Sequence, residues 1–178
     1  MAEASTGGLN PTAASLLGFL LWGPMTGWEL EQRAETSIGN FWNLTRSQIY
    51  RELHMLHQRG LVEPGEPGPR ERLPFTITES GRAAFTEWIA QPPGPEIIRF
   101  PLLLTVFFSE HLDAARLRRS LREHELQHLR RLEELQEGFA GMEDDASGPA
   151  LVMRFGIEYE QAVLRWFASL PGYDPVDR

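Results

Sequence analysis

The stretch from residue 45 to residue 62 constrains the fold of this chain more than any other part of the sequence. Thr45 and Gln48 have the spacing of a capping box, in which a hydroxyl and an amide three residues later bond free N–H groups at the start of a helix. Three apolar residues then recur at helical spacing: Ile49, Leu53 and Leu56. Gly60 is of the residue type that most often ends a helix. The pattern therefore predicts an amphipathic helix with one face in a core.

The opposite face of this predicted helix is polar. It carries Arg46, Ser47, Arg51 and, near its end, Gln58. Arginine, serine and glutamine side chains reach base edges and phosphates when a helix lies in a DNA major groove. A short strand at 61–63, a segment rich in proline and glycine, and a second strand at 73–77 are predicted after the helix. This order is typical of a winged helix-turn-helix, so the sequence predicts a DNA-binding regulator.

Capping residues predict three more helix starts in the first half of the chain, at Asn10, Thr26 and Thr78. Thr26 forms a second capping box with Glu29. Because Pro74 has no N–H to donate, we expect its strand to lie at a sheet edge or to be bulged there. Together these elements predict a winged helix-turn-helix domain over residues 10–91, which ends at a proline-rich linker.

Beyond that linker the sequence becomes strongly helical. A short, very apolar stretch lies at 97–111, and longer helices are predicted from Asp113 to about Glu137 and from Pro149 to about Leu170. We expect a C-terminal helical dimerisation domain over residues 96–172, because two long amphipathic helices usually bury their stripes against each other and a second subunit. The predicted fold class is mainly α with a small β-wing.

Composition excludes several classes of protein. Cysteine is absent, which removes disulfides, thiolate chemistry and cysteine metal sites. No apolar run approaches the roughly 18 residues of a membrane helix, and residues 1–8 lack the pattern of a signal peptide. We therefore expect a cytoplasmic protein with no membrane partner. The sequence also has no phosphate-binding glycine loop and no nucleophile elbow, so we expect no enzymatic activity and no cofactor.

The net charge of −8 argues against nucleic-acid binding at first sight, because such proteins usually carry a basic surface. Residues 1–91 hold 7 arginines and 10 acidic residues, and residues 92–178 hold 10 arginines and 15 acidic residues. Screening over roughly 8–10 Å means that DNA senses the local surface more than the total charge. We therefore expect weak non-specific affinity and specific binding through a few good contacts. The alternative is a winged helix that docks protein without binding DNA.

Several motifs of the first domain resemble those of the PadR family of bacterial transcriptional regulators. The matching segments are Leu16–Leu20, Gly23–Leu30, Phe41–Trp42, Gln48–Tyr50, Gly60–Val62 and Thr78–Arg82. The second domain, with Phe107-Phe108 and His111-Leu112-Asp113 before two long helices, is similar to the longer subclass with a virulence-activator-like C-terminal domain. The resemblance implies a homodimer that binds a pseudo-palindromic operator and usually represses. It also implies a small-molecule effector, of aromatic or drug-like character.

By this resemblance, the helix that begins after Thr45 is the recognition helix. Its DNA-binding residues would be Arg46, Ser47, Gln48 and Tyr50, and those of the wing would be Arg70 and Arg72. We add Arg51, for which a surface pair with a nearby acid is the alternative role. The alternative for Tyr50 is a ring that is half-buried with only its hydroxyl exposed. The wing departs from the family pattern, because Glu71 lies between its arginines and Pro74-Phe75 replace a tyrosine pair.

Apolar residues in the second domain exceed what two helices need to bury, and we predict that they form a dimer interface. The residues assigned to it are Phe107, Leu117, Leu121, Phe155, Val163 and Phe167. The alternative is a ligand cavity, lined by Phe100, Phe107, Phe108, Phe155, Tyr159 and Trp166.

A histidine pair in the same domain has two possible roles. His124 and His128 are one helical turn apart and have the spacing of metal ligands. We expect instead that they are polar positions on a dimer-facing helix, with Glu123 and Glu125 merely solvated. The sequence therefore predicts no metal site.

Overall fold

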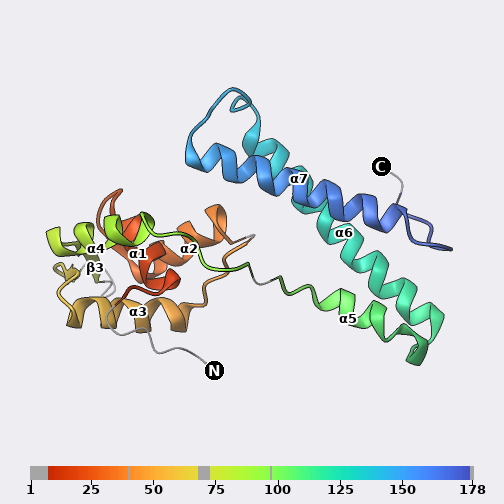
Figure 1. Cartoon of the computed structure of the whole chain (residues 1–178), viewed down its shortest axis with the longest axis horizontal. Coiled ribbons are helices and arrows are strands. Elements are labelled where there is room, and N and C mark those ends of the chain that lie inside the picture. The colour runs from red at the N-terminus through yellow and green to blue at the C-terminus, as the bar shows by residue number, and fades with distance from the viewer. Residues whose placement is uncertain (1–7, 40, 68–72, 97, 177–178) are drawn as a thin grey trace. The chain divides into compact units, whose positions relative to one another are not determined.

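The computed structural model describes residues 8–39, 41–67, 73–96 and 98–176 of the chain (Figure 1). The chain divides into two compact units between Pro95 and Glu96. The first contains α1 (Pro11–Leu20), β1 (Met25–Thr26), α2 (Gly27–Ser37), α3 (Arg46–Gln58), β2 (Val62–Pro64), β3 (Pro74–Ile77) and α4 (Glu79–Ile89). The second contains α5 (Pro101–Phe107), the 3-10 turn η2 (Ser109–His111), α6 (Ala114–Phe139) and α7 (Gly148–Ala168).

The predicted capping residues begin the helices of the first unit. The side chain of Asn10 accepts a hydrogen bond from the backbone N–H of Ala13 at 2.8 Å, at the start of α1. Both capping boxes are present, at the starts of α2 and α3. Gly60 follows α3 with φ of +69°, a conformation that glycine adopts at little cost. The predicted helix starts are thus confirmed. They could be predicted from the sequence because each cap depends on groups only a few residues apart.

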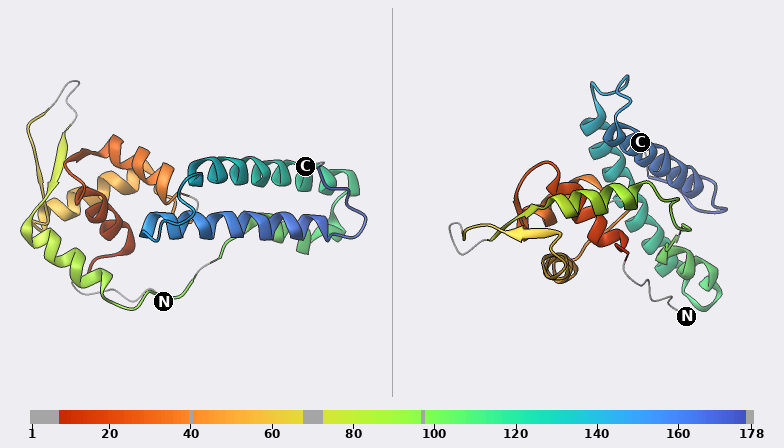
Figure 2. Two further views of the ribbon diagram at one scale, coloured as in Figure 1. Left: turned by 90° about the horizontal axis from the view of Figure 1, so that it is seen from above. Right: turned by 60° about the vertical axis from the view of Figure 1, so that its left-hand side comes forward.

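A three-stranded antiparallel sheet, in the order β1-β3-β2, completes the first unit. Strands β2 and β3 form the predicted wing, with Val62 opposite Ile77 (Figure 2). We did not predict β1, a two-residue strand that pairs Met25 with Phe75 of β3. The expectation that Pro74 lies in an edge strand is wrong, because β3 is the central strand. Pro74 is its first residue, where a missing N–H leaves no gap inside the ladder.

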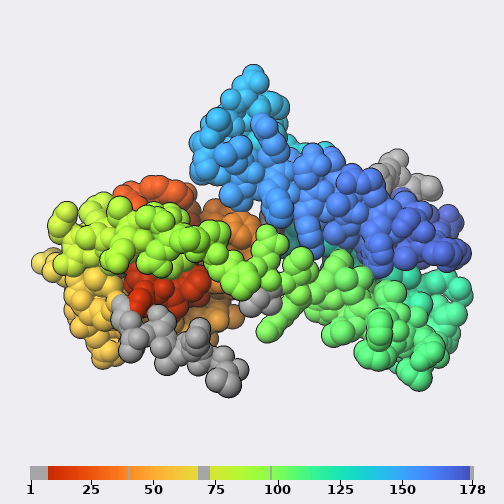
Figure 3. All heavy atoms as spheres, viewed as in Figure 1, coloured from red at the N-terminus to blue at the C-terminus, as the bar shows by residue number. Residues whose placement is uncertain are grey.

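The core of the first unit draws on every helix and on the wing. Its buried residues include Leu16, Leu17, Leu20, Leu30, Ile49, Leu53, Leu56, Val62 and Ile77. The three α3 residues predicted for the core are each 1% exposed or less. In the space-filling view the side chains of α4 cover part of α1 (Figure 3), and Phe85 of α4 packs against the core. This packing holds α3 by one face and leaves its other face in solvent.

In the second unit α6 and α7 run antiparallel and pack along their length (Figure 2). Asp113 caps α6 as predicted, accepting from the N–H of Ala115 at 2.7 Å. The buried apolar cluster is small: Leu102, Leu121, Val163 and Phe167. Partly buried neighbours, among them Phe100, Leu117 and Trp166, pack around it. The second unit is therefore a helical hairpin with α5 packed on α6.

The apolar residues predicted along α7 occupy two faces of that helix. Val163 and Phe167 are buried. Leu151, Phe155 and Tyr159, each four residues apart, are 52%, 64% and 41% exposed. An α-helix repeats every 3.6 residues, so these two sets cannot share one narrow stripe. Val163 and Phe167 are the buried pair because they lie on the side of α7 that packs against α6.

Two carboxylates are buried in the hairpin, those of Glu125 and Glu160. His128 Nδ1 lies 2.5 Å from Glu160 Oε2, so this histidine faces α7. Glu125 Oε2 accepts from the hydroxyl of Tyr173 at 2.7 Å and from the N–H of Val176 at 3.1 Å. The expectation that Glu125 is merely solvated is therefore wrong, because the segment after α7 returns to α6 and covers it. These hydrogen bonds give the buried carboxyl groups polar partners, which lowers the cost of burying them.

None of the helices in the described ranges is both long enough and apolar enough to cross a membrane. Among the same residues, no group of three or more histidine or acidic side chains is placed to hold a metal ion.

Candidate nucleic-acid interface

Helix α3 lies at the surface of the first unit (Figure 1), and its polar side chains are exposed while its core residues are buried. The exposed residues of its first three turns are Arg46, Ser47, Tyr50, Arg51, His54 and Met55. The structure thus brings five of the seven predicted DNA-binding residues together in the first two turns. The other two, Arg70 and Arg72 of the wing, lie outside the described residues.

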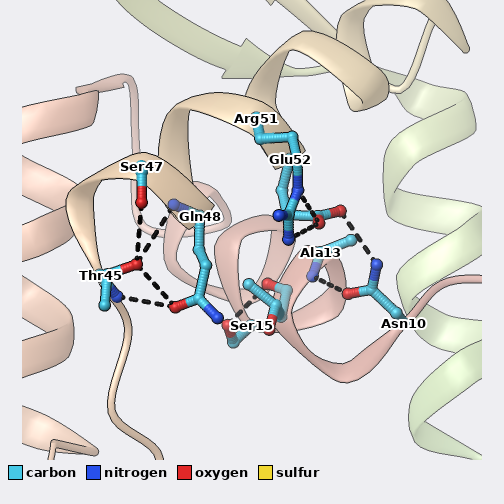
Figure 4. A network of polar contacts seen from close by, with 9 residues as sticks. Asn10, Ala13, Ser15, Thr45, Ser47, Gln48, Arg51 and Glu52 are labelled. Carbon is cyan, nitrogen blue, oxygen red and sulfur yellow. Dashed lines mark hydrogen bonds and ion pairs between the residues drawn. The ribbon is translucent and has the colours of Figure 1, made fainter.

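The capping box at the start of α3 uses one predicted DNA-binding side chain. Gln48 Oε1 accepts from the backbone N–H of Thr45 and from its hydroxyl, each at 2.9 Å (Figure 4). The hydroxyl of Ser47 lies 3.2 Å from that of Thr45. The carbonyl oxygen of Gln48 is therefore occupied within the protein, and its amide NH₂ group is the part suited to contact DNA.

Arg46, the first residue of α3, is held by an acid from another helix. Its Nε and Nη2 atoms each lie 2.8 Å from Glu31 Oε2 on α2. A positive charge at a helix N-terminus is disfavoured by the helix dipole, and the carboxylate offsets this cost. The side chain of Arg46 nevertheless remains 64% exposed, so it is accessible to a ligand.

Arg51 forms an ion pair with a nearby acid, which was the alternative to DNA contact for this residue. Its Nη2 and Nε atoms lie 3.1 and 3.3 Å from Glu52 Oε1. Glu52 Oε2 in turn accepts from Asn10 Nδ2 at 2.9 Å, which ties α3 to the start of α1 (Figure 4). Although Glu52 is an acid, it is only 7% exposed. Its spacing of three residues from Ile49 placed it on the buried face, and that signal was available.

Tyr50 lies one helical turn from Arg46 and packs against the start of α2. A Cβ atom at Gly27 would lie only 2.7 Å from Cζ of the Tyr50 ring. Glycine at this position therefore makes room for the ring. Half of the Tyr50 surface, 49%, stays exposed beside the arginines, which leaves this side chain available for contact.

The described part of the wing adds little positive charge. Glu63 of β2 and Glu66 after it are both exposed. Within the described residues of α3 and the wing, the arginines are therefore those of α3, Arg46 and Arg51.

Three of the six residues predicted for a dimer interface lie inside the second unit itself. Leu121, Val163 and Phe167 are 5%, 8% and 0% exposed in a single chain, and Leu117 packs against the same cluster. Within one chain, α6 and α7 use Leu121, Val163 and Phe167 to bind each other, and a part for them in a dimer interface stays a prediction. Phe107 and Phe155 remain exposed, so their place at an interface stays a prediction.

Exposed apolar side chains gather on two helices of the second unit. Those of α5 and the residue after it are Leu103, Leu104, Phe107 and Phe108, and those of α7 are Leu151, Val152, Phe155 and Tyr159. The rings of Phe107 and Phe108 meet edge to face, with centroids 4.9 Å apart. Exposed apolar surface of this kind is typical of an association site.

An open depression of about 420 Å³ lies beside α6 in the second unit. Its lining consists of Phe100, Pro101, His124, Gln127, His128, Arg130, Arg131 and Glu134. The rings of Phe100 and His128 contact edge to face at 5.7 Å. An aromatic surface beside imidazole and guanidinium groups suits a ligand with a ring and a carboxylate.

Two tyrosines of the second unit have raised pKa values. Burial, together with the hydrogen bond to Glu125 and its charge, raises the pKa of Tyr173 to about 12. Burial and the charge of Glu160 also raise the pKa of Tyr159, against the opposing charge of Arg131. The Tyr173 hydroxyl therefore remains protonated near neutral pH and donates to Glu125.

Two family models match the chain in succession. The model of the transcriptional regulator PadR-like family matches residues 16–87, and the model of the virulence activator alpha C-terminal domain matches residues 98–170. The first match lies in the first unit and the second match in the second unit. Together the two models cover both the candidate interface and the helical hairpin.

Individual relatives agree with the family models. The chain is 24% identical over 169 residues to the negative transcriptional regulator PadR of Bacillus subtilis, which covers 88% of this chain and 93% of that protein. It is 37% identical over 73 residues to Rv1176c of Mycobacterium tuberculosis, named as a probable transcriptional regulator, but this match spans only 39% of each chain.

Solved structures show the same fold. The structure of B. subtilis PadR in complex with operator DNA has a TM-score of 0.74 at 24% identity, and the match covers 90% of this chain and 96% of that one. The same protein in complex with p-coumaric acid has a TM-score of 0.68 at 24% identity, covering 88% of this chain and 94% of that one.

Proposed function

Because the chain belongs to the PadR-like family of transcriptional regulators, we propose that it is a sequence-specific repressor that binds a pseudo-palindromic operator as a homodimer. The observation that carries the proposal is the polar face of α3, which is exposed while the opposite face is held in the core. A helix presented in this way fits the major groove of DNA. In a dimer, two such helices would enter successive grooves about 34 Å apart.

The side chains of α3 have distinct roles in this proposal. The Arg46 and Arg51 guanidinium groups donate to guanine or to phosphate oxygens, which they bind in a planar, two-point geometry. The Tyr50 hydroxyl donates to a phosphate, and Ser47 and the amide of Gln48 contact the groove nearby. Arg70 and Arg72 of the wing, which lie outside the described residues, are proposed to add phosphate contacts. Such a protein would act in the cytoplasm, where bacterial DNA lies.

We assign dimerisation to the exposed apolar side chains of α5 and α7. Phe107 on α5 and Phe155 on α7 are the anchors, because both are large and mostly exposed in one chain. Burying aromatic side chains of this size dominates the energetics of protein interfaces. The second unit would then bring two copies of the first unit to one operator.

We further propose that a small aromatic or drug-like molecule regulates DNA binding. B. subtilis PadR has been solved with p-coumaric acid, an aromatic carboxylic acid. The depression beside Phe100 offers a ring for stacking, Arg131 offers a charge for a carboxylate, and His124 offers ring nitrogen atoms for hydrogen bonding. Release of operator DNA on addition of such acids, measured at constant salt, would support this part of the proposal.

The test of DNA binding starts from the purified chain and a pool of random-sequence duplexes. Repeated selection should enrich a palindromic motif, and fluorescence anisotropy should show that the enriched duplex binds more tightly than a scrambled one. Affinity for both should fall as salt rises, because phosphate contacts release counterions. An intact dimer that enriches no motif would favour the protein-docking alternative.

Variants of α3 locate the interface. Arg46→Ala and Tyr50→Phe should each weaken binding to the enriched duplex while the circular dichroism spectrum and the dimer stay unchanged. Arg33→Ala is a matched control, because it removes an exposed arginine of α2 in the same unit. Equal loss in Arg33→Ala and Arg46→Ala would show a general charge effect, and unchanged affinity in both α3 variants would remove α3 from the interface.

A further inference from the structure

Both arginines on the exposed face of α3 contact a carboxylate of the protein itself. Arg46 directs two nitrogen atoms to one oxygen of Glu31, and Arg51 directs two to one oxygen of Glu52. Each guanidinium charge is thus balanced before any DNA is present. Together with Glu31 and Glu52, the two arginines of this face of α3 carry no net formal charge.

The two carboxylates differ in what else they do. Glu52 is buried and also accepts from Asn10, so its removal would disturb the contact between α1 and α3. Glu31 comes from a different helix, its side chain is 20% exposed, and its partner Arg46 is 64% exposed. An ion pair this exposed contributes little to the stability of a fold. Glu31 is therefore the carboxylate whose effect on Arg46 can be separated from folding.

The geometry leaves the guanidinium group competent to bind. An arginine has five N–H groups, and the bonds from Nε and Nη2 to Glu31 use two of them. Three N–H groups remain for base edges or phosphates. Because Glu31 holds the side chain, these donors have a preferred direction, and less rotational freedom is lost when acceptors meet them.

We propose that Glu31 is a specificity-determining residue, which raises discrimination between operator and other DNA by holding and neutralising Arg46. The proposal rests on the proposed function, namely DNA recognition by α3. Non-specific binding depends almost wholly on charge, so the carboxylate weakens it. Operator binding depends on directed hydrogen bonds, which the fixed guanidinium group can still make. Glu31 therefore lowers affinity for random sequences more than affinity for the operator.

The test is Glu31→Gln, which keeps the shape of the side chain and an oxygen acceptor but removes the charge. Affinity for a scrambled duplex should rise by roughly 3- to 10-fold, affinity for the selected duplex should change less, and the salt dependence should steepen by about one phosphate contact per protomer. Glu35→Gln is the matched control, because it makes the same charge change one turn along α2, where its side chain lies 3.5 Å from Gln32.

The double variant Glu31→Gln/Arg46→Ala shows whether Glu31 acts through Arg46. The proposal expects Glu31→Gln to have no further effect on discrimination or salt dependence once Arg46 is absent. It is overturned if Glu35→Gln reproduces the effect, if the effect persists without Arg46, or if Glu31→Gln leaves discrimination unchanged while Arg46→Ala reduces it. If the unmodified chain does not discriminate between duplexes at all, the proposed function itself fails, which is a different outcome.

Discussion

The two units of this chain solve the problem of burial in opposite ways. Among the described residues, 13 buried hydrophobic residues form the core cluster of the first unit and four form that of the second. The first unit thereby closes its own core and exposes a polar helix face. The second leaves the aromatic side chains of α5 and α7 in solvent. The first unit also exposes aromatic side chains, among them Trp22 and Phe41, so the difference between the units lies in the size of the buried core. This difference fits the proposed roles, in which the first unit presents α3 and the second unit associates.

The buried acids of the two units follow the same division. Glu52 joins α1 to α3 and holds an arginine at the surface of the first unit. Glu125 and Glu160 join parts of the hairpin to each other, through Tyr173 and His128. A buried carboxylate with its partners in place orients the elements it joins, even where it adds little net stability.

The largest expected effect comes from the core of the second unit. Phe167→Ala should lower the free energy of unfolding of that unit by about 3–5 kcal/mol, because it empties a fully buried site. Urea denaturation at several protein concentrations measures this. Phe155→Ala truncates an exposed ring of the same helix. It should lower the free energy of unfolding mainly by weakening the dimer, so its effect should depend on protein concentration. A small loss in Phe167→Ala would mean that the hairpin core is not as described.

The next effect concerns association. The double variant Phe107→Asp/Phe155→Asp should raise the dimer dissociation constant by a factor of roughly 30 or more, because two aromatic anchors are replaced by charges. Sedimentation velocity should show monomers, while the first unit keeps its thermal transition. Gln136→Asp, at an exposed polar position of α6, provides the matched control. An intact dimer in the double variant would show that copies associate through another surface.

A smaller effect tests the closed core of the first unit. A Cβ atom at Gly81 would lie 2.1 Å from the carbonyl oxygen of Leu61 and 2.8 Å from a side-chain carbon of Ile77. Gly81→Ala should therefore destabilise the first unit by about 1–3 kcal/mol, although alanine favours helix. Gly94→Ala, where nothing lies within 4 Å, should be neutral in the same thermal denaturation. Stabilisation by Gly81→Ala would contradict the packing of α4.

The smallest effect concerns the pH dependence of the second unit. The folded-state pKa of Tyr173, about 12, lies above the ordinary value of 10. Its contribution to stability is therefore fully present below about pH 10 and is lost as pH rises through about 12. Tyr173→Phe should remove this part of the alkaline loss of stability, as measured by urea denaturation between pH 8 and pH 12. An unchanged profile would show that Tyr173 does not donate to Glu125 in solution.

Local patterns predicted much of this fold correctly. The starts of α1, α2 and α3 were predicted because Asn10, Thr26 and Thr45 satisfy amides only three residues away. Strand β1 was missed, because a two-residue strand exists only through its pairing with β3. The apolar residues of α7 recur at helical spacing, but their sequence does not say which of them will meet α6. In both cases a partner distant in the chain decides the outcome.

In the candidate site, too, some features follow from local sequence and others from contacts between distant residues. Helical periodicity alone places Ser47 and Arg51 opposite Ile49 and Leu53, with Tyr50 at the edge of the apolar face. Arg46 precedes Ile49 by three residues and lies nearer to that apolar face, so only the tertiary structure shows that its side chain is 64% exposed. Nothing in that spacing joins Arg46 to Glu31, 15 residues away on α2, or Glu52 to Asn10, 42 residues away. Those contacts exist only once α1, α2 and α3 pack on one core, because a long-range ion pair needs two helix surfaces brought together.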